Sequence, residues 1–154
     1  MDVYADTNFL TRLYFETTPS GPCSRMLTSG LAEGLRPLPV SWLLRLELTN
    51  AFELSVFVSR KTGQIRITSE MAAVAQATFL ADLENGSFLR RVDLPIHKIE
   101  SMFVDLSLRH TARQGFRSYD LLHVASAFAL GCDTFWSLDD RARKLAKIEG
   151  LKTN

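Results

Sequence analysis

The chain has 154 residues, a formal net charge of +1 and a hydrophobic content of 46%. These values favour a single globular domain over residues 1–154 and exclude a chain that is disordered as a whole. The near-neutral charge excludes a protein that binds nucleic acid mainly through a broad basic surface. Two cysteines without metal-ligand spacing, and no apolar run of membrane-spanning length, predict a soluble, cytoplasmic protein.

Predicted strands and helices alternate along the first half of the chain. Short β-prone apolar runs predict the strands, and apolar residues at helical spacing predict the helices, with Gly and Pro between them. The predicted elements are a strand at 3–5, helices at 7–16 and 24–32, a strand at 35–41, a helix at 42–60, and a helix that is capped by Thr68 or Ser69 and ends at 83.

The same alternation continues in the second half. The predicted elements are a strand at 88–94, a helix from Pro95 to about 113, a helix capped by Ser118, a strand at 134–138, a helix at 141–148, and a final segment, 151–154, that either begins a fifth edge strand or frays. The helix after Ser118 is apolar almost all round, so we expect it to be the buried central helix.

Alternating strands and helices predict an α/β fold with a parallel sheet and helices on both faces. Sheets of this kind bind ligands outside the carboxyl ends of their strands. Asp6 and Asp139 follow predicted strands, Glu47 comes soon after the second strand, and Asp120 precedes the fourth by one helix. One crevice at this edge can therefore collect all four acids.

Four gathered carboxylates repel one another and lose hydration, so we expect their pKa values to be raised in the absence of a cation. A fold tolerates such a cluster mainly when it holds a hard cation. Asp6, Glu47, Asp120 and Asp139 therefore predict a magnesium or manganese site, and through it phosphoester chemistry.

Each acid also has a purely structural interpretation. Asp6 can cap the first helix, Asp120 can be a first-turn acid that suits the helix dipole, and Asp139 or Asp140 can cap the last helix. Glu47 is harder to explain in this way because its helical neighbours are apolar. An unpaired charge in that stripe costs several kcal/mol or is neutralised by a pKa shift.

Three segments resemble a known family. YADTNFL, LRLELTNAF and SYDLLHVASAFALGCDTFWSLDDRARKLAKIEGL are similar to PIN-domain ribonucleases, especially the VapC-type toxins. The resemblance implies a three-layer α/β/α sandwich with a parallel sheet of four or five strands, and RNA cleavage that depends on a divalent metal. It also implies homodimers and a neutralising antitoxin encoded beside the toxin. The acidic site of the family falls on Asp6, Glu47, Asp120 and Asp139, and Ser137 stands where relatives often have threonine.

Within this site, we expect Asp6 and Asp120 to bind the metal directly. Glu47 and Asp139 then bind it through water or orient the nucleophile. Weaker candidates for contacts that support the ligands or hold phosphate or substrate are Thr7, Asn8, Arg12 and Ser137. Arg12 is equally compatible with a surface position.

Other polar and aromatic residues have two interpretations each. We expect His123 to be a core histidine with one hydrogen bond rather than a metal ligand or general base. The four-residue spacing of Arg109, Arg113 and Arg117 fits one helix face turned toward phosphate, or an ordinary solvated face. Trp42 can stack on bases, as can Trp136, although Trp136 lies in an apolar strand and is predicted to be core.

Three other functions are alternatives to the toxin ribonuclease. A receiver-like signalling domain needs an acidic neighbour for Asp6 and a lysine beside the last long strand, and the sequence has neither. A dehalogenase-type phosphatase needs a second aspartate two residues after Asp6, where this chain has Asn8. A PIN domain that serves RNA processing or RNA binding without a toxin role stays open.

Overall fold

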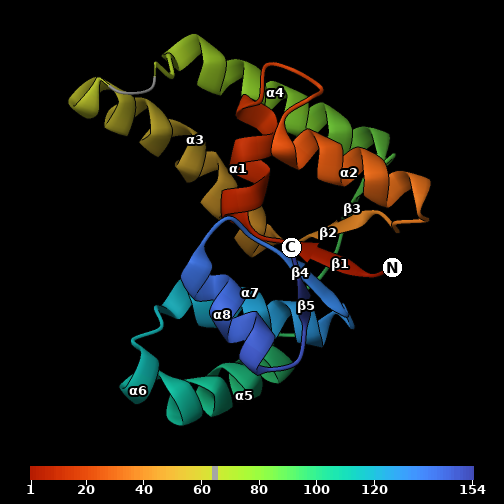
Figure 1. Cartoon of the computed structure of the whole chain (residues 1–154), viewed down its shortest axis with the longest axis vertical. Helices are drawn as coiled ribbons and strands as arrows, with labels where there is room; N and C mark the ends of the chain where they lie inside the picture. Colours follow the sequence, from red (N-terminus) through yellow and green to blue (C-terminus); the bar gives the residue numbers. More distant parts are fainter. Residues whose placement is uncertain (64–65) are drawn as a thin grey trace.

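The structure is a computed structural model that describes residues 1–63 and 66–154. Its strands are β1 (Val3–Ala5), β2 (Leu38–Val40), β3 (Leu89–Arg91), β4 (Thr134–Trp136) and β5 (Lys152–Thr153). Its helices are α1 (Thr7–Phe15), α2 (Pro22–Ala32), α3 (Trp42–Thr62), α4 (Ser69–Asn85), α5 (Ile96–Leu106), the π-helix η1 (Ser107–Thr111), α6 (Ala112–Gln114), α7 (Ser118–Ala129) and α8 (Asp140–Ile148). The strands lie between α1–α4 on one side and α5–α8 on the other (Figure 1). This is the predicted three-layer α/β/α arrangement.

All strand pairs in the described chain are parallel, but the hydrogen-bonded ladders form two groups, β1-β4-β5 and β2-β3. The single continuous sheet that the sequence predicted is therefore divided. Pro39 explains the division. Leu38 and Val40 turn their hydrogen-bonding groups toward β3, so the position of Pro39 faces the opposite edge, where a proline has no N–H to donate. The two groups are joined at their start, where the Arg36 N–H donates to the Met1 carbonyl at 3.2 Å.

Side chains of the central strands alternate between two buried clusters. Tyr4 and Phe135 stack at a centroid distance of 5.8 Å on the side of α5, α7 and α8. Trp136 points to the other side and packs on Phe9 of α1 at 5.1 Å. Trp136 is only 6% exposed, which confirms the prediction that it belongs to the core. Cys23 and Cys132 are buried free thiols, and no helix of the described chain is long and apolar enough to cross a membrane.

The helix boundaries follow local hydrogen bonds. The Thr68 hydroxyl accepts from the Met71 N–H at 3.2 Å, so Thr68 is the cap of α4. The predicted cap at Ser118 is wrong, because Ser118 is already the first residue of α7. Arg117 holds the cap position, and the Asp120 carboxylate accepts from its backbone N–H at 2.9 Å. Asp120, which the sequence predicted in the first turn of this helix, thus accepts the hydrogen bond that stabilises the start of α7.

The predicted helix from Pro95 to about 113 is present, but it is not uniform. It runs through α5, the π-helix η1 and α6 and ends at Gly115, which has a φ of 68°. The wider π turn and this glycine interrupt the four-residue repeat of Arg109, Arg113 and Arg117, so the three arginines do not share one helix face. The prediction that these three arginines line one helix face is therefore wrong.

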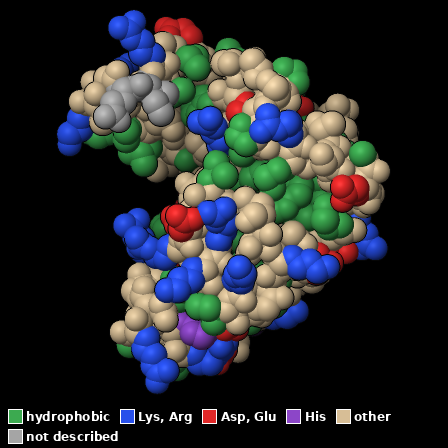
Figure 2. Space-filling model, viewed as in Figure 1, with side chains coloured by type: hydrophobic (Ala, Val, Ile, Leu, Met, Phe, Trp, Pro, Cys, Tyr) green, Lys and Arg blue, Asp and Glu red, His purple; other side chains and the backbone are tan. Residues whose placement is uncertain are grey.

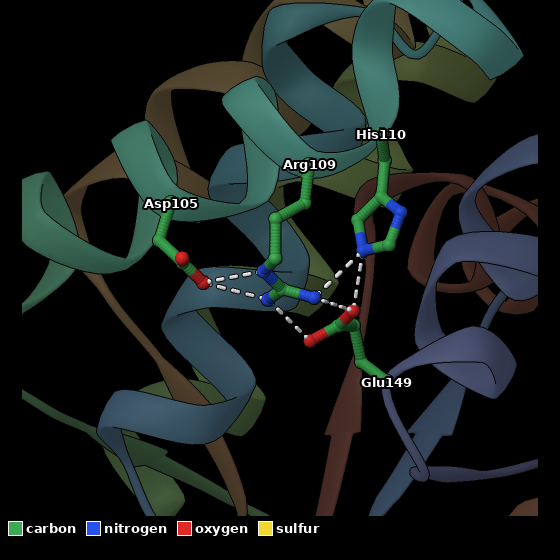
Figure 3. A network of polar contacts seen from close by, with 4 residues as sticks. All are labelled: Asp105, Arg109, His110 and Glu149. Atoms are coloured by element: carbon green, nitrogen blue, oxygen red, sulfur yellow. Dashed lines mark hydrogen bonds and ion pairs between the residues drawn. The ribbon is translucent and has the colours of Figure 1, made fainter.

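Arg109 belongs to a polar network that joins η1 to the end of α8 (Figure 3). Its guanidinium donates to Asp105 at 2.6 Å and to both carboxylate oxygens of Glu149, at 2.6 and 2.8 Å. His110 Nε2 lies 2.5 Å from the same Glu149 carboxylate. These donors, with Arg109 the strongest, hold the pKa of Glu149 below its usual range.

We expect Glu149→Gln to lower the melting temperature at pH 7 by about 2–4 °C for each kcal/mol lost. The folded-state pKa of Glu149 is lowered, so its contribution is complete above the unfolded pKa and disappears as pH falls through the folded value. The difference between the two proteins should therefore shrink between pH 5 and pH 3. Glu53→Gln, on an exposed part of α3, is the matched control. A Glu149→Gln difference that persists unchanged at pH 3 would contradict the charge-based explanation.

Candidate active site

Asp6 lies at the carboxyl end of β1 and is only 2% exposed. Its Oδ1 accepts from the Phe9 N–H at 2.9 Å, so it caps α1. Its Oδ2 accepts from the Ser137 hydroxyl at 2.6 Å. Because Ala5 pairs with Trp136 in the parallel register, the residues that follow the two strands are neighbours. Strand pairing therefore delivers Ser137 to Asp6.

Burial raises the pKa of the Asp6 carboxyl above its ordinary value. The charge of His123 and the hydrogen bonds from Ser137 and Phe9 act in the opposite direction, and the charge of Glu47 adds to the rise. Asp6 is therefore a buried acid in the electrostatic neighbourhood of Glu47 and His123, and burial is the main cause of its raised pKa.

Glu47 reaches this neighbourhood from α3. Its Oε2 accepts from the Thr7 hydroxyl at 2.5 Å and from His123 Nε2 at 2.5 Å. Burial opposes ionisation of Glu47, but these contacts with His123 and Thr7 outweigh it and lower its pKa. The expectation that repulsion raises every pKa in the cluster is wrong for Glu47, because its hydrogen-bond partners are His123 and Thr7 and not another carboxylate.

Asp120 and Asp139 are fixed by helix N-termini. Asp120 is 8% exposed in the first turn of α7, three residues before His123 on the same helix face. Asp139 is the cap of α8, with Oδ1 accepting from the Arg141 N–H at 2.8 Å. The backbone N–H of Asp139 donates to the Ser137 hydroxyl at 2.9 Å, which links it to the Asp6 site. Asp140 is exposed and forms an ion pair with Arg143 instead.

Three of these carboxylates share one property. Glu47 Oε1, Asp120 Oδ1 and Asp139 Oδ2 accept no hydrogen bond from any described residue, whereas the other oxygen of each group is held by a protein donor. Outer hydrogen bonds of this kind orient carboxylates that bind metals. Each acid thus has one anchored oxygen and one available oxygen.

The donor set suits a hydrated hard cation. Among residues 1–63 and 66–154, no three His, Cys, Asp or Glu side chains are close enough together to enclose an ion by themselves. Magnesium does not require such a cage, because it keeps several waters and binds proteins through one or two carboxylates. The available oxygens of Glu47, Asp120 and Asp139 belong to separate acids, and they fit this mode of binding.

The weaker candidates divide into two pairs. Thr7 and Ser137 both lie in the site, where their hydroxyls hold Glu47 and Asp6. Asn8 and Arg12 instead line a groove of about 440 Å³ between α1 and α3, and the Arg12 guanidinium lies 3.7 Å from Glu16. Neither Asn8 nor Arg12 contacts the four acids.

Sequence reasoning underestimated two residues. His123 is buried, as predicted, but it has three side-chain partners rather than one. Its Nδ1 lies 2.9 Å from the Tyr4 hydroxyl, and its Nε2 lies 2.5 Å from Glu47 Oε2 and 3.5 Å from the Thr7 hydroxyl. Tyr4 was treated only as part of a strand. A histidine three residues after Asp120 on a largely apolar helix was the available signal, because most buried polar side chains are hydrogen-bonded.

The surface is hollowed between the half of the molecule that carries α3 and α4 and the half that carries α5–α8 (Figure 2). Lys and Arg side chains gather over the second half in this view. Exposed basic residues of that half include Arg113, Arg117, Lys144 and Lys147.

No family model and no curated protein matches the chain by sequence. Solved structures match over nearly its full length. VapBC2 from Rickettsia felis, bound to a DNA fragment from their promoter, has a TM-score of 0.66 at 18% identity and covers 100% of this chain and 98% of that chain. VapC20 from Mycobacterium tuberculosis, a sarcin–ricin loop cleaving toxin, has a TM-score of 0.56 at 15% identity and covers 93% and 94%. FitAcB from Neisseria gonorrhoeae has a TM-score of 0.59 at 14% identity and covers 98% and 95%.

The chain therefore has the PIN-like α/β fold of VapC- and FitB-type toxin structures. The resemblance that the sequence predicted is confirmed for the fold. Between 14% and 18% identity, the likeness is one of architecture.

We expect Ser137→Ala to destabilise the protein in chelator by about 1.5–3 kcal/mol, because the buried Asp6 carboxylate loses a short hydrogen bond. Urea unfolding measures the change. Ser55→Ala is the matched control, since the Ser55 hydroxyl bonds only to the Ala51 carbonyl of its own helix, at 2.8 Å. That variant should stay within about 0.5 kcal/mol of wild type. Equal effects of the two variants would show that Ser137 does not support a charged group.

Proposed function

We propose that the protein is a divalent-metal-dependent endoribonuclease and the toxin of a toxin–antitoxin pair. The observation that carries the proposal is the hydrogen bonding of three acids: Glu47, Asp120 and Asp139 are each anchored through one oxygen and leave the other available. The likeness of fold to VapC20, a sarcin–ricin loop cleaving toxin, supports the same conclusion.

In this proposal Asp6 and Asp120 hold Mg²⁺ or Mn²⁺, and Glu47 and Asp139 hold metal-bound water or orient it. When bound, such a metal polarises a phosphate oxygen and lowers the pKa of a bound water. Ser137 and Thr7 fix Asp6 and Glu47, so that the acids need not reorganise when a substrate arrives. Burial beneath α1 and α7 excludes bulk water from Asp6 and strengthens every charge interaction there.

Basic side chains beside the acids provide for the substrate. Arg117 and Arg141 lie next to two of the acids. The backbone N–H of Arg117 donates to Asp120, and the backbone N–H of Arg141 donates to Asp139. Neither guanidinium forms an ion pair within the described chain. Guanidinium groups carried by residues next to the acids suit the phosphates of an RNA strand.

The partner in this proposal is an antitoxin protein, together with a second copy of the chain. The apolar groove between α1 and α3 lies beside the site and is lined by Phe15, Leu54 and Val58. A helical antitoxin segment can bury this surface, and an Arg or Lys that follows it can pair with the carboxylates in place of the cation. VapBC2 and FitAcB, whose toxin chains share the fold, support a two-protein system.

The first test of this function removes single negative charges. Asp6→Asn, Glu47→Gln and Asp120→Asn should each reduce Mg²⁺-dependent cleavage of RNA by at least about 100-fold while the protein stays folded, because metal ligation and water activation depend on the carboxylates. Asp139→Asn should act in the same direction and Asp140→Asn should not, since Asp140 is exposed and paired with Arg143. Full activity in any two of the first three variants would refute the assignment.

The second test concerns the toxin role. Expression of the chain alone should arrest growth, co-expression with the protein encoded beside it should restore growth, and Asp6→Asn should be harmless at equal abundance. Colony counts and immunoblots measure these outcomes. Normal growth with abundant, metal-loaded, RNA-cleaving protein would favour a PIN domain of RNA processing instead.

A further inference from the structure

His123 joins three segments that are distant in sequence. It belongs to α7, its Nδ1 lies 2.9 Å from the hydroxyl of Tyr4 in β1, and its Nε2 lies 2.5 Å from Oε2 of Glu47 in α3. The ring is 4% exposed and also contacts the Tyr4 ring at a centroid distance of 5.8 Å. A ring enclosed in this way has almost no freedom to rotate.

The direction of the hydrogen bond to Glu47 does not depend on the charge of the ring. A carboxylate only accepts, so Nε2 carries the hydrogen and donates it whether the imidazole is neutral or protonated. Tyr4 then either donates to Nδ1 or accepts from it. In both cases the hydroxyl of Tyr4 fixes the plane of the ring and therefore the position of the Nε2 hydrogen.

Both donors to Glu47 act on the same oxygen. Thr7 and His123 each lie 2.5 Å from Oε2, and no described residue donates to Oε1. A free glutamate side chain loses about 1.5–2 kcal/mol of rotamer freedom when a ligand orders it. In this protein the fold has already ordered the Glu47 side chain, so a ligand does not have to order it again. The oxygen that remains available is Oε1.

We propose that His123, held by Tyr4, is a positioning residue that fixes Glu47 so that Oε1 faces a bound divalent cation or its water. The inference rests on the proposed metal-dependent function. A purely structural role for His123 predicts a different outcome, because Glu47 is 24% exposed on its side chain and could turn to solvent without its partner. Loss of His123 would then change stability and leave cation binding unaltered.

The experiment is calorimetric titration of the metal-free protein with Mn²⁺, in wild type, His123→Leu, His123→Gln and Tyr4→Phe. We expect His123→Leu to bind Mn²⁺ roughly 10–100-fold more weakly, as is usual when an outer partner of a ligand is lost. His123→Gln keeps an amide donor near the position of Nε2 and should recover most of the affinity. Tyr4→Phe should weaken binding in the same direction and by less.

The chain contains matched controls for both substitutions. His110 pairs with Glu149 at the same 2.5 Å, and the Tyr14 hydroxyl donates to Asp82 at 2.9 Å, both away from the four acids. His110→Leu and Tyr14→Phe should lower the melting temperature and leave Mn²⁺ affinity within about threefold of wild type. If His123→Leu fails to fold, Tyr4→Phe and His123→Gln against these controls decide the question.

Two outcomes separate this inference from the proposed function. Wild-type affinity for Mn²⁺ in folded His123→Leu, or in Tyr4→Phe where the leucine variant is unfolded, overturns the positioning role alone. The second outcome is a wild-type protein that binds no Mn²⁺ while its proton NMR spectrum still shows the downfield ring N–H of a short His123–Glu47 hydrogen bond. That outcome overturns the metal-dependent function and the positioning role together. Loss of that proton signal in Glu47→Gln assigns it.

Discussion

The hydrogen bond between Ser137 and Asp6 ties the site to the sheet. Parallel pairing of β1 with β4 places Ala5 opposite Trp136, and so the next residues of both strands meet at the same edge. The Asp6 N–H also donates to the Trp136 carbonyl at 3.0 Å, which continues the ladder to the acid itself. A buried carboxylate needs such donors, because without them its charged form is too costly to bury. The register of two three-residue strands therefore determines where an ionisable group can be kept.

The other acids depend on the same edge through helices that begin there. Asp139 caps α8 directly after β4, and Glu47 lies in the second turn of α3, after β2. Helix N-termini offer unpaired N–H groups, and these groups hold one oxygen of Asp120 and one of Asp139. A hydrogen bond that caps a helix consequently also orients the carboxylate that accepts it. The structural explanation of each acid, which looked like an alternative to a functional one, is instead the way in which the acid is oriented.

This overlap also explains what the sequence could and could not predict. The order of strands and helices, the core position of Trp136 and a cap at Thr68 or Ser69 follow from local pattern, and they were predicted. The split of the sheet at Pro39 depends on which neighbour each N–H faces, and the π turn in η1 depends on packing, so neither is visible in a single segment. The partners of His123 lie 119 and 76 residues away, a distance that helical periodicity does not cover. Periodicity places a residue on a face, and only the assembled fold supplies its neighbours.

Two histidine–glutamate pairs in the chain show why contact distance alone does not reveal a site. His110–Glu149 and His123–Glu47 have the same separation of 2.5 Å. In the first pair Arg109 and His110 contact both oxygens of Glu149, so neither oxygen lacks a protein partner. In the second pair both donors converge on one oxygen of Glu47 and the other has none among the described residues. Each carboxylate oxygen can accept more than one bond, as the two oxygens of Asp6 would for a cation, but a carboxylate that is held by a single oxygen keeps its other oxygen free of protein donors. The unfilled acceptor, rather than the short contact, is the physical property that separates Glu47 from Glu149.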